Sequence, residues 1–268
     1  MFDITKHAKE KLIERFKNCS TNKVDGKGYV FQPEHNLIPG LTMEQFNDDL
    51  REGSGDELRK KFRAIHSSSA LAVNTFARWK KDPRTLSLCG VHGFNNIQFE
   101  KKCPTGLGGT PPNLDLLAEA DQVIIALESK LLEYLNPKKP TFTSSYSRTQ
   151  LPHAEDKWWD LLEEMRGSEP LYLDIAQLIK HYLGLVNQPG YRRRKIILLY
   201  LFWEPENRKE FDIFKKHREQ IAWFADQVEN TAVTFSSRSY PELWKEWESE
   251  NALADHLAHL RKRYCVTL

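Results

Sequence analysis

The amino-acid sequence predicts an α/β fold in which helices flank a mixed central sheet. Two apolar segments, LDLLAEA at 114–120 and VIIALESK at 123–130, are separated by a polar turn and have the pattern of a β-hairpin. The run KIILLYLFW at 195–203 is apolar on both faces, as is typical of a buried central strand. Helical periodicity at 155–165 and 171–185 lies between them, so we expect helices to connect the hairpin to that strand.

The segments before the hairpin predict further helices. Residues 3–18 have the alternation of charged and apolar positions of a short amphipathic helix. Apolar positions recur at helical spacing between residues 55 and 80, which predicts one or two helices. Ser67 or Ser68 is suited to cap a helix that begins there.

One more strand is expected at residues 91–103, which contain β-branched and aromatic side chains, and we expect it to end near residue 99 or 100. The last third, at 210–228 and 240–264, is predicted to be mainly helical and is rich in tryptophan. The predicted order is therefore helix, three strands, helix, strand, with additional helices at both ends.

The length of 268 residues accommodates one large domain with extensions. We expect a helical and loop extension at 1–54, a core at 55–205, and a C-terminal helical extension at 206–268 packed on the core. Apolar residues make up 40% of the chain, which is enough for a sizeable core and excludes a disordered chain.

Charge and cysteine content narrow the class of protein. The net charge is only +2, so a nucleic-acid site must come from local basic clusters. The four cysteines are far apart and form no CxxC pair, which fits neither a disulfide framework nor a zinc ribbon. The N-terminal segment lacks the apolar stretch of a signal peptide, and no segment is apolar enough to span a membrane, so we expect a soluble cytoplasmic protein.

The hairpin brings charged residues together. If it turns at Asp121 and Gln122, Asp115 lies directly opposite Glu128, with Cβ atoms roughly 4.5 to 5.5 Å apart. Side chains alternate along a strand, so Lys130 lies on the same side as Glu128. Two carboxylates and an ammonium group therefore converge.

Like charges directly opposite each other destabilise a sheet, and a hard cation removes that repulsion. Mg²⁺, for which Mn²⁺ can substitute, is typically held by one or two carboxylates together with water and phosphate oxygens. Such a metal polarises a phosphate and lowers the pKa of a bound water, while Lys130 can orient that water or stabilise developing charge. We therefore expect Asp115 and Glu128 to bind a metal, and Lys130 to act beside it.

These residues resemble a known nuclease core. PNLD ending at Asp115, ESK at 128–130 and the predicted order of elements are similar to the restriction-endonuclease-like core of PD-(D/E)XK nucleases. Several segments together resemble a bacterial family of predicted restriction endonucleases over roughly residues 50–265: SSSALAVNTF, NLDLLAEA, IALESKLLEYL, LDIAQLIKHYLGL and ILLYLFWEP. The resemblance implies acids on the central hairpin, dependence on a divalent metal and hydrolysis of phosphodiester bonds. The proline does not immediately precede Asp115 as in the family pattern, because Asn113 and Leu114 intervene.

The resemblance also suggests two further site residues. Glu100 is a candidate metal ligand, because related nucleases often use an additional acid from the first helix or first strand. The alternative is a solvated glutamate beside two lysines. Gln177 shares a helical face with Lys180 and His181 and resembles the glutamine-bearing helix of several nucleases, which implies that it positions the substrate. An ordinary polar helix face is the alternative.

Phosphate contacts are expected from two basic clusters, Arg192, Arg193 and Arg194 before the buried strand, and Lys138, Lys139 and Arg148 in a polar loop. Simple solvation is the alternative for both. His256 and His259 lack the further ligands that a zinc site needs. The glycines at 106–110 lack the lysine of a Walker loop and are expected in a loop beside the active site.

The leading hypothesis is a Mg²⁺-dependent endonuclease that cuts double-stranded DNA in restriction or defence. A homodimer and a companion methyltransferase would accompany that function. Two alternatives stay open, an inactive nuclease-fold protein that only binds nucleic acid, and a nuclease for DNA repair or RNA.

Overall fold

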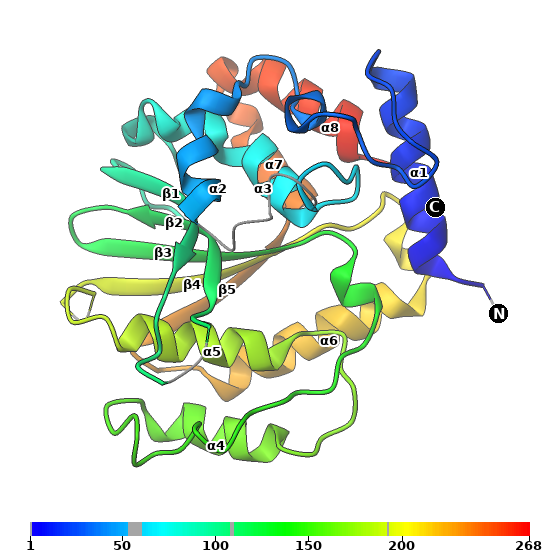
Figure 1. Cartoon of the computed structure of the whole chain (residues 1–268). Helices are drawn as coiled ribbons and strands as arrows, with labels where there is room; N and C mark the ends of the chain where they lie inside the picture. The colour runs from blue at the N-terminus through cyan, green and yellow to red at the C-terminus, as the bar shows by residue number, and fades with distance from the viewer. Residues whose placement is uncertain (1, 53–60, 108–109, 192) are drawn as a thin grey trace.

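A single five-stranded sheet forms the centre of the computed structural model, which describes residues 2–52, 61–107, 110–191 and 193–268 (Figure 1). Its strands lie side by side in chain order: β1 (Asn96–Lys102), β2 (Asn113–Glu119), β3 (Val123–Lys130), β4 (Lys195–Phe202) and β5 (Val233–Ser239). The pairs β1/β2 and β2/β3 are antiparallel, whereas β3/β4 and β4/β5 are parallel. The predicted mixed sheet is confirmed.

Helices cover both faces of this sheet (Figure 1). One face carries three helices, with two more packed outside them: α2 (Asn47–Glu52), α3 (Ser68–Phe76) and α7 (Tyr240–Glu246), then α1 (Ile4–Cys19) and α8 (Ala254–Tyr264). The other face carries α5 (Ile175–Val186) and α6 (Asp212–Gln227), with α4 (Asp156–Met165) packed on α5. Short 3-10 helices occur in the connections, at Pro33–Asn36, Met43–Gln45, Ala77–Lys80, Pro83–Thr85, Glu133–Leu135, Arg208–Glu210, Trp247–Ser249 and Asn251–Leu253.

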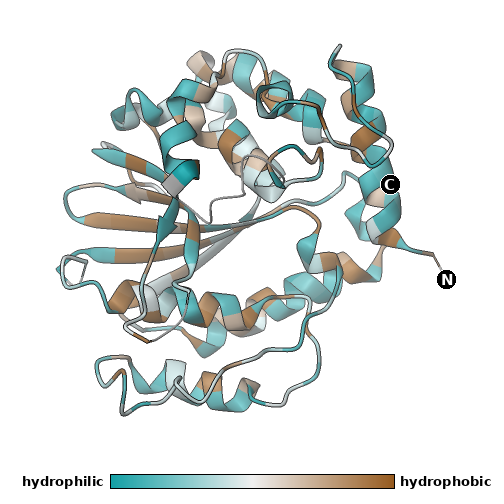
Figure 2. Ribbon diagram, viewed as in Figure 1, coloured by the Kyte–Doolittle hydropathy of each residue, from teal (hydrophilic) through white to brown (hydrophobic). Residues whose placement is uncertain are grey.

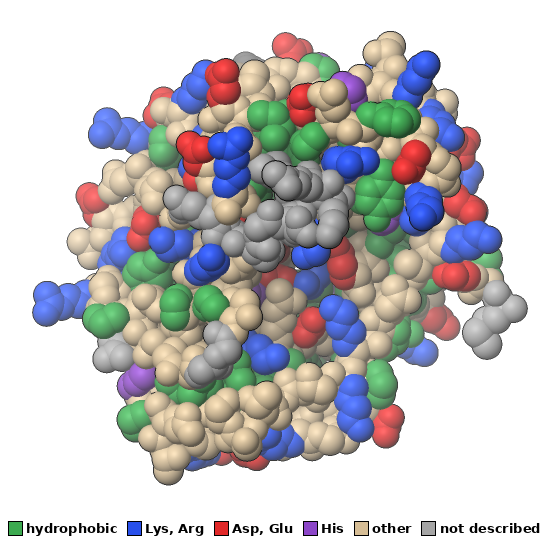
Figure 3. Space-filling view, in the orientation of Figure 1, with side chains coloured by type: hydrophobic (Ala, Val, Ile, Leu, Met, Phe, Trp, Pro, Cys, Tyr) green, Lys and Arg blue, Asp and Glu red, His purple; other side chains and the backbone are tan. Residues whose placement is uncertain are grey.

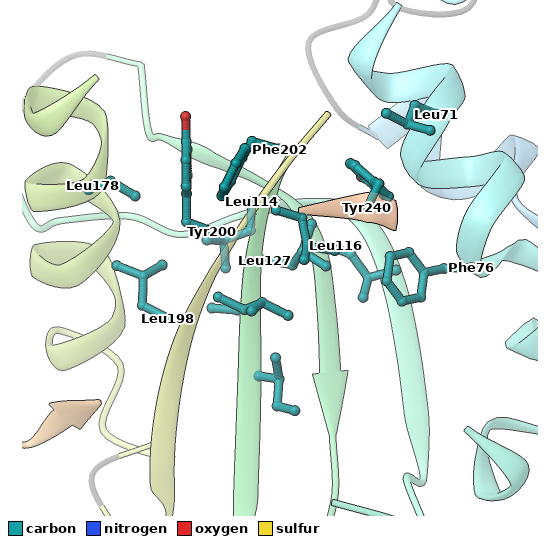
Figure 4. Close-up of a cluster of buried hydrophobic side chains, with 14 of the residues drawn as sticks. Leu71, Phe76, Leu114, Leu116, Leu127, Leu178, Leu198, Tyr200, Phe202 and Tyr240 are labelled. Atoms are coloured by element: carbon teal, nitrogen blue, oxygen red, sulfur yellow. The ribbon is translucent and has the colours of Figure 1, made fainter. Parts of the chain in front are cut away.

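The core consists of two apolar layers, one on each side of the sheet. Figure 4 shows Leu71 and Phe76 of α3 directed at one face, and Leu198 and Tyr200 of β4 beside Leu178 of α5 on the other. Hydrophobic residues accordingly concentrate on the strands and the inner sides of the helices (Figure 2). Each large apolar side chain buried in this way contributes about 1.5–3 kcal/mol. Six of the seven tryptophans are buried, Trp79, Trp158, Trp159, Trp203, Trp244 and Trp247, whereas Trp223 is half-buried.

The central strand β4 confirms the prediction made from its uninterrupted apolar run. Every residue of β4 after Lys195 is buried, because the strand lies between β3 and β5 and helices cover both of its faces. A parallel neighbour needs a crossover connection, and α4 and α5 provide it between β3 and β4.

The capping and the start of α3 also follow the sequence. The Ser67 side chain accepts a hydrogen bond from the Ala70 backbone N–H at 3.2 Å, so the helix begins at Ser68. The other half of the predicted helical region falls partly on residues 53–60, which lie outside the described residues. Residues 62–66 form turns instead of a helix, because Ala64 pairs with Tyr29 as an isolated bridge.

Two strands differ from the prediction. β1 begins at Asn96 and continues past Glu100 to Lys102, because Lys101 and Lys102 still pair with β2. β5 lies in a segment predicted to be mainly helical and extends the sheet beyond β4. Its sequence, VTFSSRS, alternates apolar and polar residues only at Val233 and Phe235, so an edge strand with a half-exposed face gave little signal. No described helix is long and apolar enough to cross a membrane.

Candidate active site

The predicted hairpin register is confirmed. β2 and β3 pair Leu116 with Leu127 and Leu117 with Ala126, and the same register places Asp115 opposite Glu128. The Asp115 carboxylate oxygen Oδ2 accepts a hydrogen bond from the Ser129 backbone N–H at 2.6 Å. Both acids therefore lie at the end of the sheet where the parallel strands β3, β4 and β5 have their carboxyl ends, which is where α/β sheets usually bind ligands.

Lys130 lies beside Glu128 on the face of the sheet that α5 covers. Its Nζ lies 2.5 Å from Glu128 Oε1, an ion pair whose geometry is not that of an aligned hydrogen bond. Lys130 Nζ donates a hydrogen bond to Gln177 Oε1 at 2.7 Å. Glu128 is 1% exposed and Lys130 is 8% exposed, so this pair is largely withdrawn from water. The predicted convergence of Lys130 with Glu128, and the placement of Gln177 beside them, agree with the structure.

A second side chain of α5 reaches the site. His181 Nε2 lies 2.7 Å from Glu128 Oε2, and the histidine is fully buried. Gln177 and His181 are four residues apart and therefore lie on the same helix face. His181 was predicted only to share a helix face with Gln177, and its contact with Glu128 was not predicted. The available signal was that four-residue spacing on a helix following the hairpin.

The position of α5 is fixed at both of its ends. Asp174 caps the helix by accepting a hydrogen bond from the Gln177 backbone N–H at 3.1 Å. Near the other end, Gly184 lies against the backbone at the end of β1, because a Cβ atom built on Gly184 would be only 2.3 Å from the Cys103 carbonyl oxygen. The lack of a side chain at 184 thus allows α5 to approach the sheet closely enough for Gln177 and His181 to make their contacts.

The two acids differ in their electrostatic surroundings. Burial raises the pKa of Asp115 well above its usual value, and the negative charges of Glu128 and Glu100 raise it further. Burial alone would also raise the pKa of Glu128, but Lys130 and His181 outweigh it and lower that pKa to about 2. Burial would lower the pKa of Lys130, yet Glu128 and Asp115 raise it instead. The expected unneutralised pair of acids is therefore wrong for Glu128, because the Lys130 ammonium and the His181 ring lie in direct contact with its two oxygens.

Glu100 is the third acid at this end of the sheet. The β1/β2 register, which pairs Phe99 with Leu116 and Lys101 with Leu114, places Glu100 opposite Asp115. Glu100 is only 7% exposed, which excludes the alternative of a solvated surface glutamate. Its backbone φ is +49°, a left-handed conformation that costs a non-glycine residue on the order of 1 kcal/mol or more. Irregular backbone of this kind changes the direction of a side chain on a strand. The negative charge of Glu100 contributes to the raised pKa of Asp115.

The chemistry of these oxygens fits a divalent cation. In the described part of the chain, no three His, Cys, Asp or Glu side chains form a closed metal cage. The carboxylates come instead from adjacent strands, and Asp115 keeps part of its surface exposed, which suits Mg²⁺ because that ion keeps several waters and substrate oxygens as ligands. Two observations support the fit: the Glu128 oxygen Oε1 is buried without an aligned hydrogen bond, and Asp115 bears the repulsion of two neighbouring acids. Figure 3 shows acidic and basic side chains next to one another in a hollow near the middle of the drawn face of the molecule.

The predicted basic clusters lie at different distances from the site. Lys195 pairs with Val123, so Arg193 and Arg194 lie at the opposite end of β3 from Lys130, roughly 23 Å away for seven strand residues. Arg194 also forms an ion pair with Glu119 at 3.0 Å. Arg192 lies outside the described residues.

The other cluster is closer to α5. Lys138 Nζ lies 3.1 Å from Asp174 Oδ2 at the start of α5, and Lys139 is exposed. Arg148 forms ion pairs with Asp156 and Asp160 of α4. Among the described residues of the two predicted clusters, Lys138 contacts the start of α5, and Lys139 is next to it in the sequence.

The glycine-containing loop is not beside the acids in its described part. Gly106 packs against Asn187, at the carboxyl end of α5 and roughly 15 Å along the helix from Gln177. Residues 108–109 of this loop lie outside the described residues.

A family model described as "restriction endonuclease associating with ARP" matches residues 5–265. The chain belongs to this family of restriction endonucleases. The match includes the hairpin with Asp115, Glu128 and Lys130 as well as helix α5, and it confirms the predicted resemblance to restriction endonucleases. No curated protein and no solved structure matches the chain.

Proposed function

We propose that this member of the restriction endonuclease family is a metal-dependent endonuclease that hydrolyses DNA phosphodiester bonds at Asp115, Glu128 and Lys130. One observation supports the proposal: a buried Glu128–Lys130 ion pair lies beside Asp115, whose pKa is raised by burial and by the negative charges of Glu128 and Glu100. Strongly shifted pKa values with specific charge partners are typical of functional sites. A purely structural role would not need three acids at one end of a sheet.

The acids would hold the metal. Asp115 and Glu128 supply carboxylate oxygens, and Glu100 is placed to contribute a third. Mg²⁺, or Mn²⁺ in its place, supplies a Lewis acid for the phosphate and lowers the pKa of a bound water.

Lys130 and Gln177 would act on the substrate side. Lys130 keeps its proton in this setting, so its ammonium can orient the attacking water or stabilise negative charge that develops on the phosphate. The Gln177 oxygen holds Nζ at 2.7 Å and thereby limits where the ammonium can move. Pre-organised donors of this kind commonly contribute two to three orders of magnitude to a rate.

The family assignment supports double-stranded DNA as the substrate and a role in restriction or defence.

Lys138 and Lys139 would contact phosphates near α5. Arg193 and Arg194 would do so only on a duplex that runs along the whole sheet. The family description also names an association with ARP, and we extend that association to this chain. A homodimer and a companion methyltransferase stay predictions.

The test is cleavage of plasmid, linear duplex, single-stranded DNA and RNA by the purified chain in Mg²⁺, Mn²⁺ or EDTA. We expect duplex cleavage in Mg²⁺ that EDTA abolishes and that Asp115→Asn, Glu128→Gln and Lys130→Ala each reduce by orders of magnitude. Asp121→Asn, at the exposed hairpin turn, is the matched control and should leave cleavage unchanged. Cleavage by Asp115→Asn at the wild-type rate would refute the mechanism. Duplex binding without cleavage under every condition would favour the inactive, nucleic-acid-binding alternative.

A further inference from the structure

His181 is a buried histidine that the proposed catalytic roles do not use. It is fully buried on α5, and its Nε2 lies 2.7 Å from Glu128 Oε2. The Lys130 ammonium lies 2.5 Å from the other oxygen of Glu128, so Glu128 is a carboxylate here and the His181 Nε2–H donates a hydrogen bond to Oε2. The other ring nitrogen, Nδ1, has no hydrogen-bond partner in the described part of the chain. The single polar contact of this ring is therefore with the candidate metal ligand.

The two oxygens of Glu128 have different surroundings as a result. Oε2 accepts the hydrogen bond from His181, whereas Oε1 is buried with only the ion pair to Lys130 and no aligned hydrogen bond. Lys130 in turn directs its hydrogen bond at Gln177. The carboxylate is thus held at Oε2 by His181 of α5, whereas the described contact of Oε1 is the ion pair with Lys130.

We propose that His181 is a positioning residue, which anchors Glu128 Oε2 so that Oε1 is presented to the divalent metal; this rests on the proposed function. Fixing a glutamate side chain costs up to about 2 kcal/mol of rotamer entropy, and His181 has already fixed it before a cation arrives. Outer partners of metal ligands typically contribute 10–100-fold to metal affinity. Gln177 and His181 then have parallel roles on one helix face, since Gln177 holds Lys130 and His181 holds Glu128.

A second buried histidine provides a matched control. His217 of α6 is also fully buried, its Nδ1 also lacks a partner among the described residues, and its Nε2 lies 3.0 Å from the Tyr200 hydroxyl. Tyr200 is the β4 residue paired with Glu128, so both histidines contact neighbouring positions of the sheet. His217 contacts no candidate metal ligand. A general effect of removing a buried histidine would appear equally in both.

The test compares His181→Gln with His181→Met, two side chains of similar size of which only glutamine can donate a hydrogen bond to Glu128. Calorimetric titration with Ca²⁺ should show roughly 10–100-fold weaker binding in His181→Met than in the wild type. His181→Gln should retain most of the affinity, and His217→Met should retain all of it while lowering the melting temperature. Equal affinities in wild type and His181→Met would overturn the proposal, as would equal losses in His181→Met and His217→Met.

The proposed function can fail separately, because in that case the wild type itself binds neither Ca²⁺ nor Mg²⁺. If the His181 variants do not fold, ¹⁵N-labelled wild type carries the test. The His181 Nε2–H resonance should persist and shift when Ca²⁺ is added. A resonance that saturating Ca²⁺ leaves in place would overturn the proposal.

Discussion

Replacing Glu128 by glutamine should destabilise the metal-free protein, even though it removes one of two acids that face each other. The side chain is 1% exposed and contacts Lys130 at 2.5 Å and His181 at 2.7 Å. Its pKa falls from 4.5 to about 2 in the folded chain, which corresponds to about 3 kcal/mol of stability at neutral pH. Loss of one partner of a buried ion pair gives a similar range, about 3–5 kcal/mol. The melting temperature should fall by roughly 5–10 °C.

The pH dependence provides the sharper test. A carboxyl whose pKa is lowered by folding stabilises the protein above its unfolded pKa, and that contribution is lost as the pH falls toward the folded pKa. The difference in the free energy of unfolding between wild type and Glu128→Gln should therefore have its full value at pH 7 and decrease between about pH 4.5 and pH 2. Urea denaturation in EDTA at several pH values measures it. A difference of zero at pH 7, or one that stays constant down to low pH, would refute the reasoning.

Asp115→Asn is the matched variant and should have the opposite sign. Its carboxyl has a raised pKa, first through burial and then through Glu128 and Glu100, so its charge lowers stability as the pH rises above the unfolded pKa. Asparagine keeps an oxygen that can accept the Ser129 N–H and removes the charge. We expect a metal-free melting temperature at neutral pH that is equal to or higher than that of the wild type. A clear loss of stability would show that the repulsion at Asp115 is compensated.

Three further predictions follow from single contacts. Replacing a helical glycine by alanine ordinarily stabilises a protein by about 1 kcal/mol. Gly184→Ala should instead destabilise it by about 1–3 kcal/mol and reduce cleavage, because the new Cβ meets the Cys103 carbonyl oxygen. A melting temperature and a cleavage rate equal to those of the wild type would contradict this. Glu100→Asn relieves left-handed strain and a like charge, so thermal melts should show a gain on the order of 1 kcal/mol while cleavage falls; unchanged cleavage would remove Glu100 from the metal site. Replacing Lys138 and Lys139 by alanine should lower the salt slope of duplex binding in Ca²⁺ by about 2, and an unchanged slope would assign both lysines to solvation.

The sequence by itself determined the hairpin, its register and the central strand. A polar turn between two alternating apolar segments leaves one pairing that buries the apolar face, so Asp115 and Glu128 had to lie opposite each other. The same alternation placed Lys130 beside Glu128. These are local consequences of a period of two, and they need no knowledge of the rest of the chain.

Only the tertiary structure decided what surrounds those residues. The rotation and height of α5 depend on packing against the sheet, on the Asp174 cap and on Gly184. Helical spacing therefore places Gln177 and His181 on one face of α5 but does not determine which side chains they contact. Packing also determined the electrostatics. Lys130 and His181 lower the pKa of Glu128, whereas burial and the charges of Glu128 and Glu100 raise the pKa of Asp115. Long-range packing sets desolvation and partner distances, whereas sequence periodicity sets only the face on which a side chain lies.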